Sequence, residues 1–394
     1  MPSCAPKVLL VANWDWVIYN FRLPLARALR AHGYEVVLVF PFGKFLERIR
    51  AEGFRCIPWS LDRGSLNPLQ DGRALWQLVR IYQEERPHIV HHFTIKPNLY
   101  GSLAARWGSL NHRGSIRPTA INTFEGLGFM FSDHLKARLL RWGLIPFLRY
   151  ALHRPNTWTV FLNEQDRAFF LRRGWVPAHR STVIVSTGVD IQRFRPAGGG
   201  PVGKGSEGPL TVLMAGRLLW DKGVGEFVQA ARILRQKGLR VRLRLIGSPD
   251  PGNPACVPEA QVRAWAREGL IEWLGHREDM PELLREAHVA VLPSYHEGVP
   301  RFLLEAAATG LPLVATDIEG CRAVVRPGEN GFLVPVRDAQ ALAEAIERLA
   351  QDPALREQMG RASRAIAIQE FDEQKILAQW LTLYQQIRTE VGTS

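Results

Sequence analysis

Short apolar runs alternate with amphipathic helical stretches along the chain, and this alternation restricts the fold more than any other feature. In the first half, strands are predicted over Val8–Ala12, Val36–Phe40, Ile89–His92, Ala120–Thr123 and Thr159–Asn163, and helices over Arg22–His32 and Arg73–Arg86. Strands that alternate with helices are typical of a parallel sheet covered by helices on both faces. The pattern therefore predicts an α/β protein.

The alternation is interrupted at residues 196–209 and then begins again. This segment, PAGGGPVGKGSEGP, is rich in Gly and Pro and holds nothing that packs in a core, so it predicts a linker. Beyond it, strands are predicted over Thr211–Ala215, Val241–Gly247, Ile271–Leu274, Val289–Pro293 and Leu313–Thr316, and helices over Val224–Gln236, Pro258–Glu268, Met280–Glu286 and Phe302–Thr309.

The 394 residues are enough for two or three domains that each bury a core. We expect Rossmann-like domains over residues 1–195 and 210–371, and a C-terminal helix over 372–394 that packs back on the first domain. Two sheets joined by a flexible linker would face each other across a cleft at their carboxyl ends, where ligands of such folds bind.

Positive charge is concentrated in one half of the chain. The net charge is +12, but residues 1–195 hold 27 Lys and Arg against 13 Asp and Glu, whereas residues 196–394 hold 23 against 25. This asymmetry predicts an anionic partner for the first half alone. Nucleic acid is not expected to be that partner, because the chain has no helix-turn-helix, zinc or RNA-binding motif and its basic residues are spread out.

Four cysteines lie far apart, and none has the spacing of a metal site. Cys4, Cys56, Cys256 and Cys321 are therefore expected to be reduced thiols of a cytoplasmic protein. The apolar run near the N-terminus is too short for a signal peptide, and no run approaches the roughly 18 apolar residues of a membrane-spanning helix. We expect a chain that lies in the cytoplasm or on a membrane surface.

Two cations follow the first predicted strand of the second domain. In VLMAGRLLWDKGVGEF, Arg217 and Lys222 lie between an apolar strand and a helix. Cations beside the amides of a helix N-terminus form a site for a multiply charged phosphate. Considered alone, the stretch fits two solvated surface charges equally well.

Two glutamates flank a loop further along, in SYHEGVPRFLLEAAATGLP. Glu297 and Glu305 are separated by seven residues, and Gly298 and Pro300 between them suit a close backbone approach and a helix start. This arrangement predicts that one carboxylate accepts hydrogen bonds from sugar hydroxyls and the other from ribose hydroxyls. The alternative is that both belong to a solvated helix face.

These segments occur together and in order, and together they resemble a known family. GRLLWDKG, EGVPRFLLEAAATGLP and GCRAVVRPGENGFLVP are similar to the retaining GT-B glycosyltransferases of family 4, and the resemblance covers essentially the whole chain. In the first half, ANWDWVIYNFRLPLARALRAHGYEV, HHFTIKPNLYGSLAARW and INTFEGLGFMF resemble the bacterial subgroup that acts on undecaprenyl-diphosphate-linked saccharides. That subgroup includes the N-acetylgalactosaminyltransferase of N-glycosylation and capsule or O-antigen enzymes. The resemblance implies two Rossmann-like domains that face each other across a cleft.

The resemblance also implies a UDP-sugar site in the second domain. Arg217 and Lys222 match the pair that binds the donor diphosphate and stabilises departing UDP. Glu297 matches the carboxylate near the donor sugar, and Glu305 the one that holds the ribose. The other positions implied to contact the donor are Gly298, Val299, Pro300, Gly247 and Arg277. No metal or other cofactor is implied, because no DxD motif follows a strand and the two cations take that role.

The sequence departs from the family pattern at two places in the first domain. Many relatives have a Gly-Gly loop after the first strand, where this chain has Asn13 and Trp14, so Asn13 or its amide is expected at the floor of the cleft. Many relatives have a histidine after a later strand, where INTFEGLGF places Glu125. By its position, Glu125 is the candidate for contact with the attacking acceptor hydroxyl.

Three further residues are candidates for acceptor binding. His92 and Lys96 lie in HHFTIKP, where the lysine suits an acceptor diphosphate, and Asp15 lies in the turn NWDW. The structural alternatives are that His91 and His92 lie at a strand end with their hydrogen bonds satisfied, and that Asp15 caps the helix that follows.

A basic and aromatic stretch predicts contact with a membrane. HLKARLLRWGLIPFLRYALHR, at residues 134–154, interleaves Leu, Trp, Phe and Tyr with Lys and Arg, a composition that can lie in an anionic bilayer surface. The alternative is a pair of core-facing helices with solvated arginines. Because a lipid-linked acceptor is implied, we favour a peripheral protein on the cytoplasmic face of the inner membrane.

The sequence thus predicts a retaining glycosyltransferase. It would move a sugar, expected to be an N-acetylhexosamine, from a UDP donor to a polyprenyl-diphosphate-linked saccharide. Catalysis would come from orientation of the substrates and stabilisation of the leaving group. The alternatives are a GT-B nucleotide-sugar epimerase and a catalytically inactive membrane scaffold of a glycan assembly complex, and the intact Arg217, Lys222, Glu297 and Glu305 argue against the scaffold.

Overall fold

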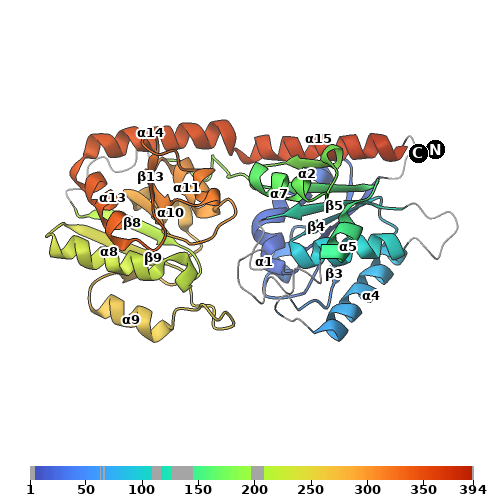
Figure 1. Cartoon of the computed structure of the whole chain (residues 1–394), viewed down its shortest axis with the longest axis horizontal. Helices are drawn as coiled ribbons and strands as arrows, with labels where there is room; N and C mark the ends of the chain where they lie inside the picture. The colour runs from blue at the N-terminus through green and yellow to red at the C-terminus, as the bar shows by residue number, and fades with distance from the viewer. Residues whose placement is uncertain are drawn as a thin grey trace. The chain divides into compact units, whose positions relative to one another are not determined.

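The chain folds into two α/β units, each with its own parallel sheet (Figure 1). The computed structural model describes residues 5–62, 64, 67–108, 117–125, 145–196 and 208–392. The first unit takes the chain up to residue 187 together with residues from 376 onward, and the second unit takes residues 188–375. Most of the expected linker, residues 197–207, lies outside the described residues.

The first unit is built on a seven-stranded sheet with the order β3-β2-β1-β4-β5-β6-β7. Its strands are β1 (Lys7–Val11), β2 (Glu35–Phe40), β3 (Arg55–Pro58), β4 (Ile89–Phe93), β5 (Thr119–Phe124), β6 (Thr157–Phe161) and β7 (Ser181–Val183). β1 pairs in parallel with both β2 and β4. The strand order therefore reverses between β1 and β4, the place where doubly wound sheets bind their ligands.

Helices cover both faces of this first sheet. They include α1 (Asp15–Val17), the π-helix η1 (Ile18–Arg22), α2 (Leu23–Ala31), α3 (Leu46–Arg50), α4 (Pro68–Glu85), α5 (Ile95–Trp107), α7 (Glu164–Arg172) and α15 (Glu373–Gly392), and residues 145–152 are also helical. Side chains of β1 alternate between the two faces: Val8 and Leu10 pack with α2 and α15, whereas Leu9 and Val11 pack with α4 and α5.

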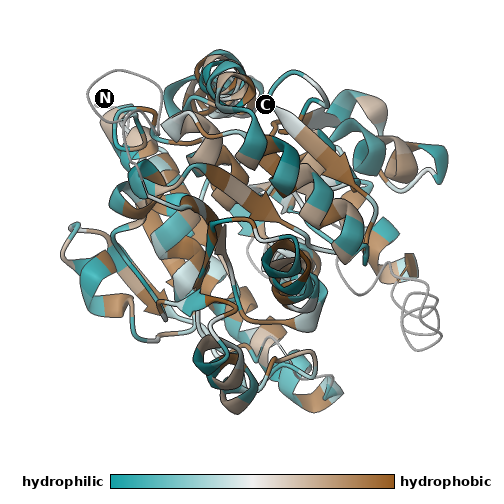
Figure 2. Cartoon of the chain, turned by 90° about the vertical axis from the view of Figure 1, so that its left-hand side faces the viewer, coloured by the Kyte–Doolittle hydropathy of each residue, from teal (hydrophilic) through white to brown (hydrophobic). Residues whose placement is uncertain are grey.

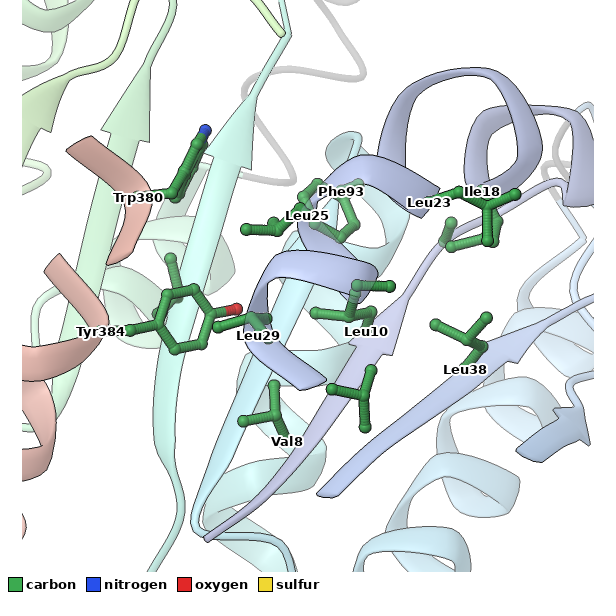
Figure 3. Close-up of a cluster of buried hydrophobic side chains, with 14 of the residues drawn as sticks. Val8, Leu10, Ile18, Leu23, Leu25, Leu29, Leu38, Phe93, Trp380 and Tyr384 are labelled. Atoms are coloured by element: carbon green, nitrogen blue, oxygen red, sulfur yellow. The ribbon is translucent and has the colours of Figure 1, made fainter. Parts of the chain in front are cut away.

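The C-terminal helix α15 supplies part of the core of the first unit. Trp380 and Tyr384 are fully buried among residues of β1, β2 and α2, and Figure 3 shows Tyr384 beside Leu29. The Tyr384 hydroxyl hydrogen-bonds Nδ1 of His91 at 2.8 Å, and the Trp380 ring lies 4.9 Å from the His91 ring. The last helix of the chain thus completes the hydrophobic core on one face of the first sheet.

The second unit repeats the plan with six strands in the order β10-β9-β8-β11-β12-β13. Its strands are β8 (Leu210–Ala215), β9 (Val241–Ile246), β10 (Glu272–Trp273), β11 (Val289–Leu292), β12 (Leu313–Thr316) and β13 (Gly331–Val334). Its helices include α8 (Val224–Gln236), α9 (Glu259–Arg267), α10 (Met280–Glu286), α11 (Arg301–Thr309), α12 (Glu319–Arg322), α13 (Ala339–Gln351) and α14 (Pro353–Glu370). The strand order reverses between β8 and β11.

The burial pattern of the second unit agrees with its sequence periodicity. Val212 and Met214 of β8 pack with Phe227 of α8 and Ile346 of α13, whereas Leu213 is buried on the opposite face. In Figure 2 the strands are largely brown, while the helices carry both teal and brown residues. Strands buried on both faces and amphipathic helices are what a covered parallel sheet requires.

The predicted α/β class is confirmed, and each predicted strand and helix is present with ends shifted by a few residues. The strands β3, β7 and β13 were not predicted. β3 holds an exposed arginine and ends in proline, and β7 has only three residues, so neither shows a strand period.

Two expectations about the whole chain can be compared with the described residues. Within them, no helix is both long and apolar enough to cross a bilayer. Cys56, Cys256 and Cys321 are free thiols.

Trp380→Ala should lower the free energy of unfolding by about 3–5 kcal/mol, because it removes a large buried ring and leaves a cavity. Chemical denaturation followed by circular dichroism measures the change. Gln386→Ala is the matched control, because Gln386 is exposed on the same helix and should shift the transition little. Equal effects of the two substitutions would show that α15 contributes no core packing.

Candidate functional site

The candidate site of the second unit lies where two loops meet at the carboxyl edge of its sheet. One loop follows β8 and the other follows β11, the strands between which the order reverses. The Tyr295 amide donates to the Asp221 carbonyl at 2.8 Å, and a Cβ at Gly223, whose φ is +75°, would lie 2.1 Å from the Pro293 oxygen. Only glycine permits this approach, so the two loops are tightly joined.

The joined loops bring Lys222 and Glu297 together. The Lys222 Nζ donates to the Glu297 Oε1 at 2.5 Å, and the side chains keep 20% and 14% of their surface exposed. The ion pair is therefore accessible to a ligand. The interpretation of Lys222 as an isolated solvated charge is wrong.

The loop that carries Glu297 and Gly298 packs closely against α12. A Cβ added to Gly320 would lie 1.6 Å from the Gly298 oxygen and 2.5 Å from the Glu297 oxygen. Val299 and Pro300 then lead into α11, with Pro300 as its N-cap. The short loop thus lies against the bare backbone of Gly320 on one side, and its Glu297 side chain meets Lys222 on the other.

Glu305 lies on α11 in a different environment from Glu297. It is buried, and the Arg301 Nε donates to its Oε1 at 2.8 Å. Burial raises the pKa of the Glu305 carboxyl, and the charges of Arg301 and Arg193 oppose that shift. Glu297 precedes α11 and Glu305 is buried in it, so the alternative of a shared solvated helix face is wrong.

Bare backbone also lines the ends of β8, β9 and β10. The Gly247 amide donates to the Gly275 carbonyl at 2.8 Å, and its own carbonyl accepts from the Trp273 Nε1 at 2.9 Å. Gly247 has a φ of +140°, and a Cβ there would lie 1.8 Å from the Gly216 oxygen. The segments that follow these three neighbouring strands therefore each contain a glycine, Gly216, Gly247 or Gly275, whose backbone is not covered by a side chain of its own.

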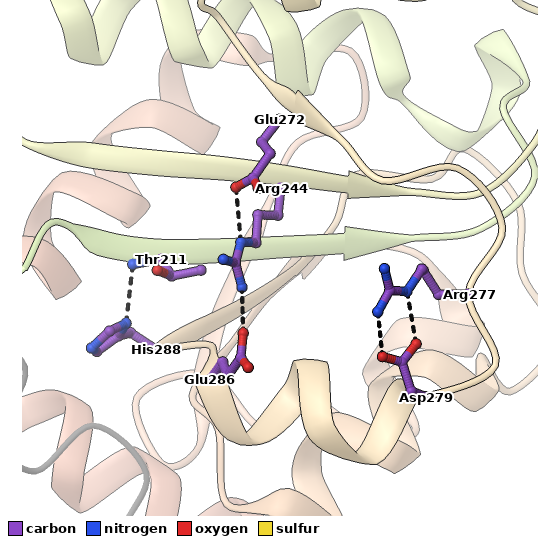
Figure 4. A network of polar contacts seen from close by, with 7 residues as sticks. All are labelled: Thr211, Arg244, Glu272, Arg277, Asp279, Glu286 and His288. Atoms are coloured by element: carbon purple, nitrogen blue, oxygen red, sulfur yellow. Dashed lines mark hydrogen bonds and ion pairs between the residues drawn. The ribbon is translucent and has the colours of Figure 1, made fainter.

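Two other candidate cations bind acidic residues instead of joining Lys222. Arg217 is half-exposed, and its Nη1 lies 3.1 Å from the Asp250 carboxylate. The Arg277 Nε donates to Asp279 at 2.8 Å, an exposed pair that Figure 4 shows beside the Arg244 network with Glu272 and Glu286. The hydrogen bond with Asp279 raises the pKa of Arg277.

In the first unit, Glu125 follows β5 at the carboxyl edge of the sheet and forms an ion pair with Arg22. Arg22 ends the π-helix η1 and is buried, with its guanidinium carbon 4.2 Å from the centre of the Phe93 ring. Burial lowers the pKa of Arg22 to about 9, which leaves it charged at neutral pH. Glu125 keeps 25% of its side chain exposed, so Arg22 orients a carboxylate that solutes can reach.

Asp15 is buried at the first position of α1, where the N-cap is Trp14. Its Oδ2 accepts from the Phe45 amide at 2.7 Å, and a Cβ at Gly43 would lie 2.7 Å from the same oxygen. The expectation that Asp15 binds the acceptor is wrong for this conformation, because the loop after β2 covers it. The alternative that Asp15 caps the helix is also wrong, because the cap is one residue earlier.

His92 lies in the core and not at a ligand surface. Its ring hydrogen-bonds the Tyr82 hydroxyl at 2.9 Å and the Asn122 Oδ1 at 2.8 Å, and burial lowers its pKa to about 4. His91 points to the other face of the sheet and hydrogen-bonds Thr123 as well as Tyr384. The structural alternative for both histidines is confirmed, and His92 is removed from the acceptor candidates.

Lys96 and Asn13 remain at the carboxyl edge of the first sheet. The Lys96 Nζ donates to the Asp71 Oδ1 at 2.9 Å and to the Asp62 carbonyl at 3.0 Å. Asn13 is half-buried in the turn directly after β1. Within the described residues, no cluster of three His, Cys, Asp or Glu side chains has the geometry of a metal site.

Comparison with known proteins decides the family. A family described as "Glycosyl transferases group 1" matches residues 209–352, and one described as "Glycosyl transferase 4-like" matches residues 7–157. The chain is 30% identical over 379 residues to the N,N'-diacetylbacillosaminyl-diphospho-undecaprenol alpha-1,3-N-acetylgalactosaminyltransferase of Campylobacter jejuni, covering 94% of this chain and 96% of that one. This chain belongs to the glycosyltransferase family that the group 1 and 4-like descriptions together denote.

This glycosyltransferase has one further relative that supports the assignment and one solved structure that matches its fold. It is 25% identical over 303 residues to the UDP-Gal:alpha-D-GlcNAc-diphosphoundecaprenol alpha-1,3-galactosyltransferase of Escherichia coli, covering 74% of this chain and 73% of that one. The crystal structure of HepE from Anabaena, in complex with UDP and glucose, matches with a TM-score of 0.75 at 20% identity, covering 97% of this chain and 100% of that one. The predicted GT-B fold of the glycosyltransferase is confirmed.

Two residues that contact the candidate site residues, one in each unit, were missed in the sequence. Arg22 occupies a position on the apolar stripe formed by Ile18, Leu25 and Leu29, and a cation on a buried stripe was a signal that it needs a carboxylate. Gly320 begins the motif GCRAVVRPGENGFLVP, but nothing in the sequence indicates that it lies against the Gly298 carbonyl.

Gly320→Ala should reduce the initial rate of sugar transfer by about 10²-fold, because the new Cβ must displace the loop that carries Glu297, and a displacement of about 1 Å is enough for such a loss. Gly225→Ala in α8 is the control, because its Cβ would meet Trp220 only at 3.4 Å. Rates and thermal unfolding are measured for both. A Gly320→Ala enzyme with the rate of the control would contradict the proposed position of the loop in the site.

Proposed function

We propose that this glycosyltransferase moves an N-acetylhexosamine from a UDP donor to a saccharide carried on a polyprenyl diphosphate, with retention of the anomeric configuration. The names of two relatives support this: both act on undecaprenol-diphosphate-linked saccharides, and one uses UDP-Gal. The observation that carries the proposal is the Lys222–Glu297 pair at the strand-order reversal of the second sheet. An accessible cation there suits a diphosphate leaving group.

The donor is proposed to bind along the carboxyl edge of the second sheet. Lys222 neutralises the diphosphate, and Arg217 joins it by exchanging the Asp250 carboxylate for a phosphate oxygen. Glu305 accepts hydrogen bonds from the ribose. The sugar contacts Glu297, Gly298, Val299 and Pro300, and the uracil contacts the bare backbone near Gly247 and the segment at Arg277.

Metal-independent catalysis is part of the proposal. Its support is that the charge developing on UDP would meet cations held in place before the reaction, which lowers the barrier without reorganisation. Lys222 is held by Glu297 and by the joined loops. No protein nucleophile is assumed.

The acceptor is proposed to bind at the carboxyl edge of the first sheet. Arg22 holds the Glu125 carboxylate in one orientation, and a carboxylate oxygen there can accept a hydrogen bond from the attacking hydroxyl. Lys96 is proposed to exchange Asp71 for the acceptor diphosphate. Asn13 keeps a proposed place beside the donor.

Peripheral association with the cytoplasmic face of the inner membrane is also proposed. Its support is the positive charge of residues 1–195, where 27 cations stand against 13 acidic residues. Residues 134–144 of the basic stretch lie outside the described residues. Residues 145–152 form a helix on which Phe147 and Tyr150 are exposed.

Incubation with a set of UDP-sugars and a short-chain polyprenyl-diphosphate saccharide should yield an acceptor extended by one α-linked sugar, as nuclear magnetic resonance of the product would show. Omission of the acceptor is the control, because an epimerase would turn over the donor without it. A β-linked product from an α-linked donor would contradict retention. Failure of UDP to bind in calorimetry would favour the inactive scaffold.

Lys222→Ala should reduce kcat by about 10²–10³-fold, because it removes a group proposed to stabilise the leaving UDP. Lys237→Ala is the matched control, since Lys237 makes an equally short ion pair, 2.5 Å, with Glu347 on the surface of the same unit. Steady-state kinetics separate kcat from KM for each variant. Equal kcat values would remove Lys222 from the proposed mechanism.

A further inference from the structure

A cavity of about 100 Å³ lies on the first unit, at the edge of the sheet opposite to Glu125. It is several times larger than the space one water molecule needs. Its lining comes from α5, from the residues that precede β5 and β6, and from the helix at 145–152. Neither the proposed donor site nor the proposed acceptor site uses it.

The cavity is lined by three arginines: Arg106, Arg117 and Arg154. Among the described residues that line it, none is acidic. The guanidinium carbons of Arg106 and Arg154 lie 4.2 Å and 4.6 Å from the centre of one ring, that of Tyr150. They are therefore less than about 9 Å apart, close to one Debye length at physiological salt, so their repulsion is only partly screened. An anion in the cavity would relieve it.

The cavity lies at the opposite end of β5 from Glu125, where the acceptor hydroxyl is proposed to react. Arg117 precedes β5, whereas Glu125 follows it, so the strand separates the two by roughly 17 Å. A diphosphate held at the cavity is therefore too far from Glu125 to be directly attached to a sugar whose hydroxyl contacts Glu125. The ligand that fits is a separate anion.

The elements that build the cavity also expose aromatic rings. Phe147 and Tyr150, on the helix at 145–152, are 58% and 40% exposed. Trp107 follows Arg106 at the end of α5, and its ring lies 6.1 Å from the 60%-exposed Trp76 on the neighbouring α4 (Figure 1). Exposed aromatic rings beside arginines are typical of a surface that enters the headgroup region of a bilayer.

We propose that this arginine cavity binds the phosphate headgroup of an anionic phospholipid, an inference that deepens the proposed membrane association and rests on it. The guanidinium groups of Arg106, Arg117 and Arg154 hold the phosphate oxygens by charge-assisted hydrogen bonds. Phe147 and Trp76 enter the interface around the bound headgroup. The cavity thus fixes which face of the first unit lies on the membrane.

Co-sedimentation of the full-length protein with vesicles tests the cavity. The wild type should bind vesicles of phosphatidylcholine mixed with phosphatidylglycerol and should bind pure phosphatidylcholine vesicles weakly. The double variant Arg117→Gln/Arg154→Gln should bind the anionic vesicles about 25-fold more weakly, since each arginine near an anionic surface contributes about fivefold. Thermal unfolding of both proteins checks that the variant is folded.

The control is Arg50→Gln/Arg172→Gln, which removes the same charge from exposed positions of the same unit away from the cavity. It should lose less than a factor of about three in vesicle binding, since only long-range attraction is reduced. An equal loss in both double variants would overturn the proposal in favour of a diffuse basic surface. The proposal would also be overturned if the wild-type protein did not bind anionic vesicles more strongly than phosphatidylcholine vesicles.

A soluble arm distinguishes a lipid from free phosphate. Calorimetry with inorganic phosphate and with glycerol 3-phosphate should show much weaker binding than the vesicles, because the aromatic rings then have no bilayer to enter. Tight binding of inorganic phosphate that the Arg117→Gln/Arg154→Gln variant abolishes would replace the lipid with a soluble anion and overturn the proposal. Sugar transfer to a soluble short-chain acceptor is measured separately in the wild type, so loss of vesicle binding and failure of the proposed transferase activity are distinguishable.

Discussion

Two backbone contacts that leave no room for a side chain determine the site of the second unit. Gly223 lies against the Pro293 carbonyl and Gly320 against the Gly298 carbonyl, so that the loop after β11 is held at both of its ends. Glu297 meets Lys222 because of this path. The attraction between two partly exposed charges is worth only about 1 kcal/mol or less and could not position a loop by itself. The ion pair is thus a consequence of where two glycines allow the backbone to go, and Glu305 follows because α11 begins directly after the same loop.

Each unit has a carboxylate paired with a cation at the edge of its sheet, but the two cations differ in burial. At the carboxyl edge of each sheet, a carboxylate is oriented by a cation from another element, Glu297 by Lys222 and Glu125 by Arg22. In the second unit both partners are partly exposed. In the first unit the cation is buried, and its lost hydration costs several kcal/mol unless a partner compensates for it. Glu125 therefore also stabilises the fold, because it compensates the charge of the buried Arg22. This role requires a carboxylate directly after β5, whether or not Glu125 contacts substrate.

Sequence periodicity predicted the fold well because parallel strands buried on both faces leave a strong apolar signal, as in β1 and β8. It failed for β3, whose ends are exposed, and it said little about α5, which holds Pro97 and Gly101 and buries residues around most of its circumference. Motifs singled out Lys222 and Glu297 as candidate donor-site residues, but did not indicate that the two pair with each other. His92 looked like a ligand-binding residue because the groups that satisfy it, Tyr82 and Asn122, lie on other elements. Arg22 was missed for the same reason, since Glu125 is 103 residues away.

The charge asymmetry between the halves acquires a physical meaning from these pairings. In the second unit, arginines are matched with acids on neighbouring elements, as Arg244 is with Glu272 and Glu286 and Arg326 is with Glu370. Such pairs leave a nearly neutral surface around the accessible Lys222, which is proposed to attract the anionic donor. In the first unit, arginines surround a cavity whose described lining has no acid. A cation that is left near other cations raises the energy of the isolated protein, and that energy is recovered when an anion binds. The same sheet architecture thus carries positive charge in two arrangements. One is a single ion pair at the sheet edge of the second unit, proposed to meet a diphosphate, and the other is an arginine-lined cavity of the first unit, proposed to meet a lipid headgroup.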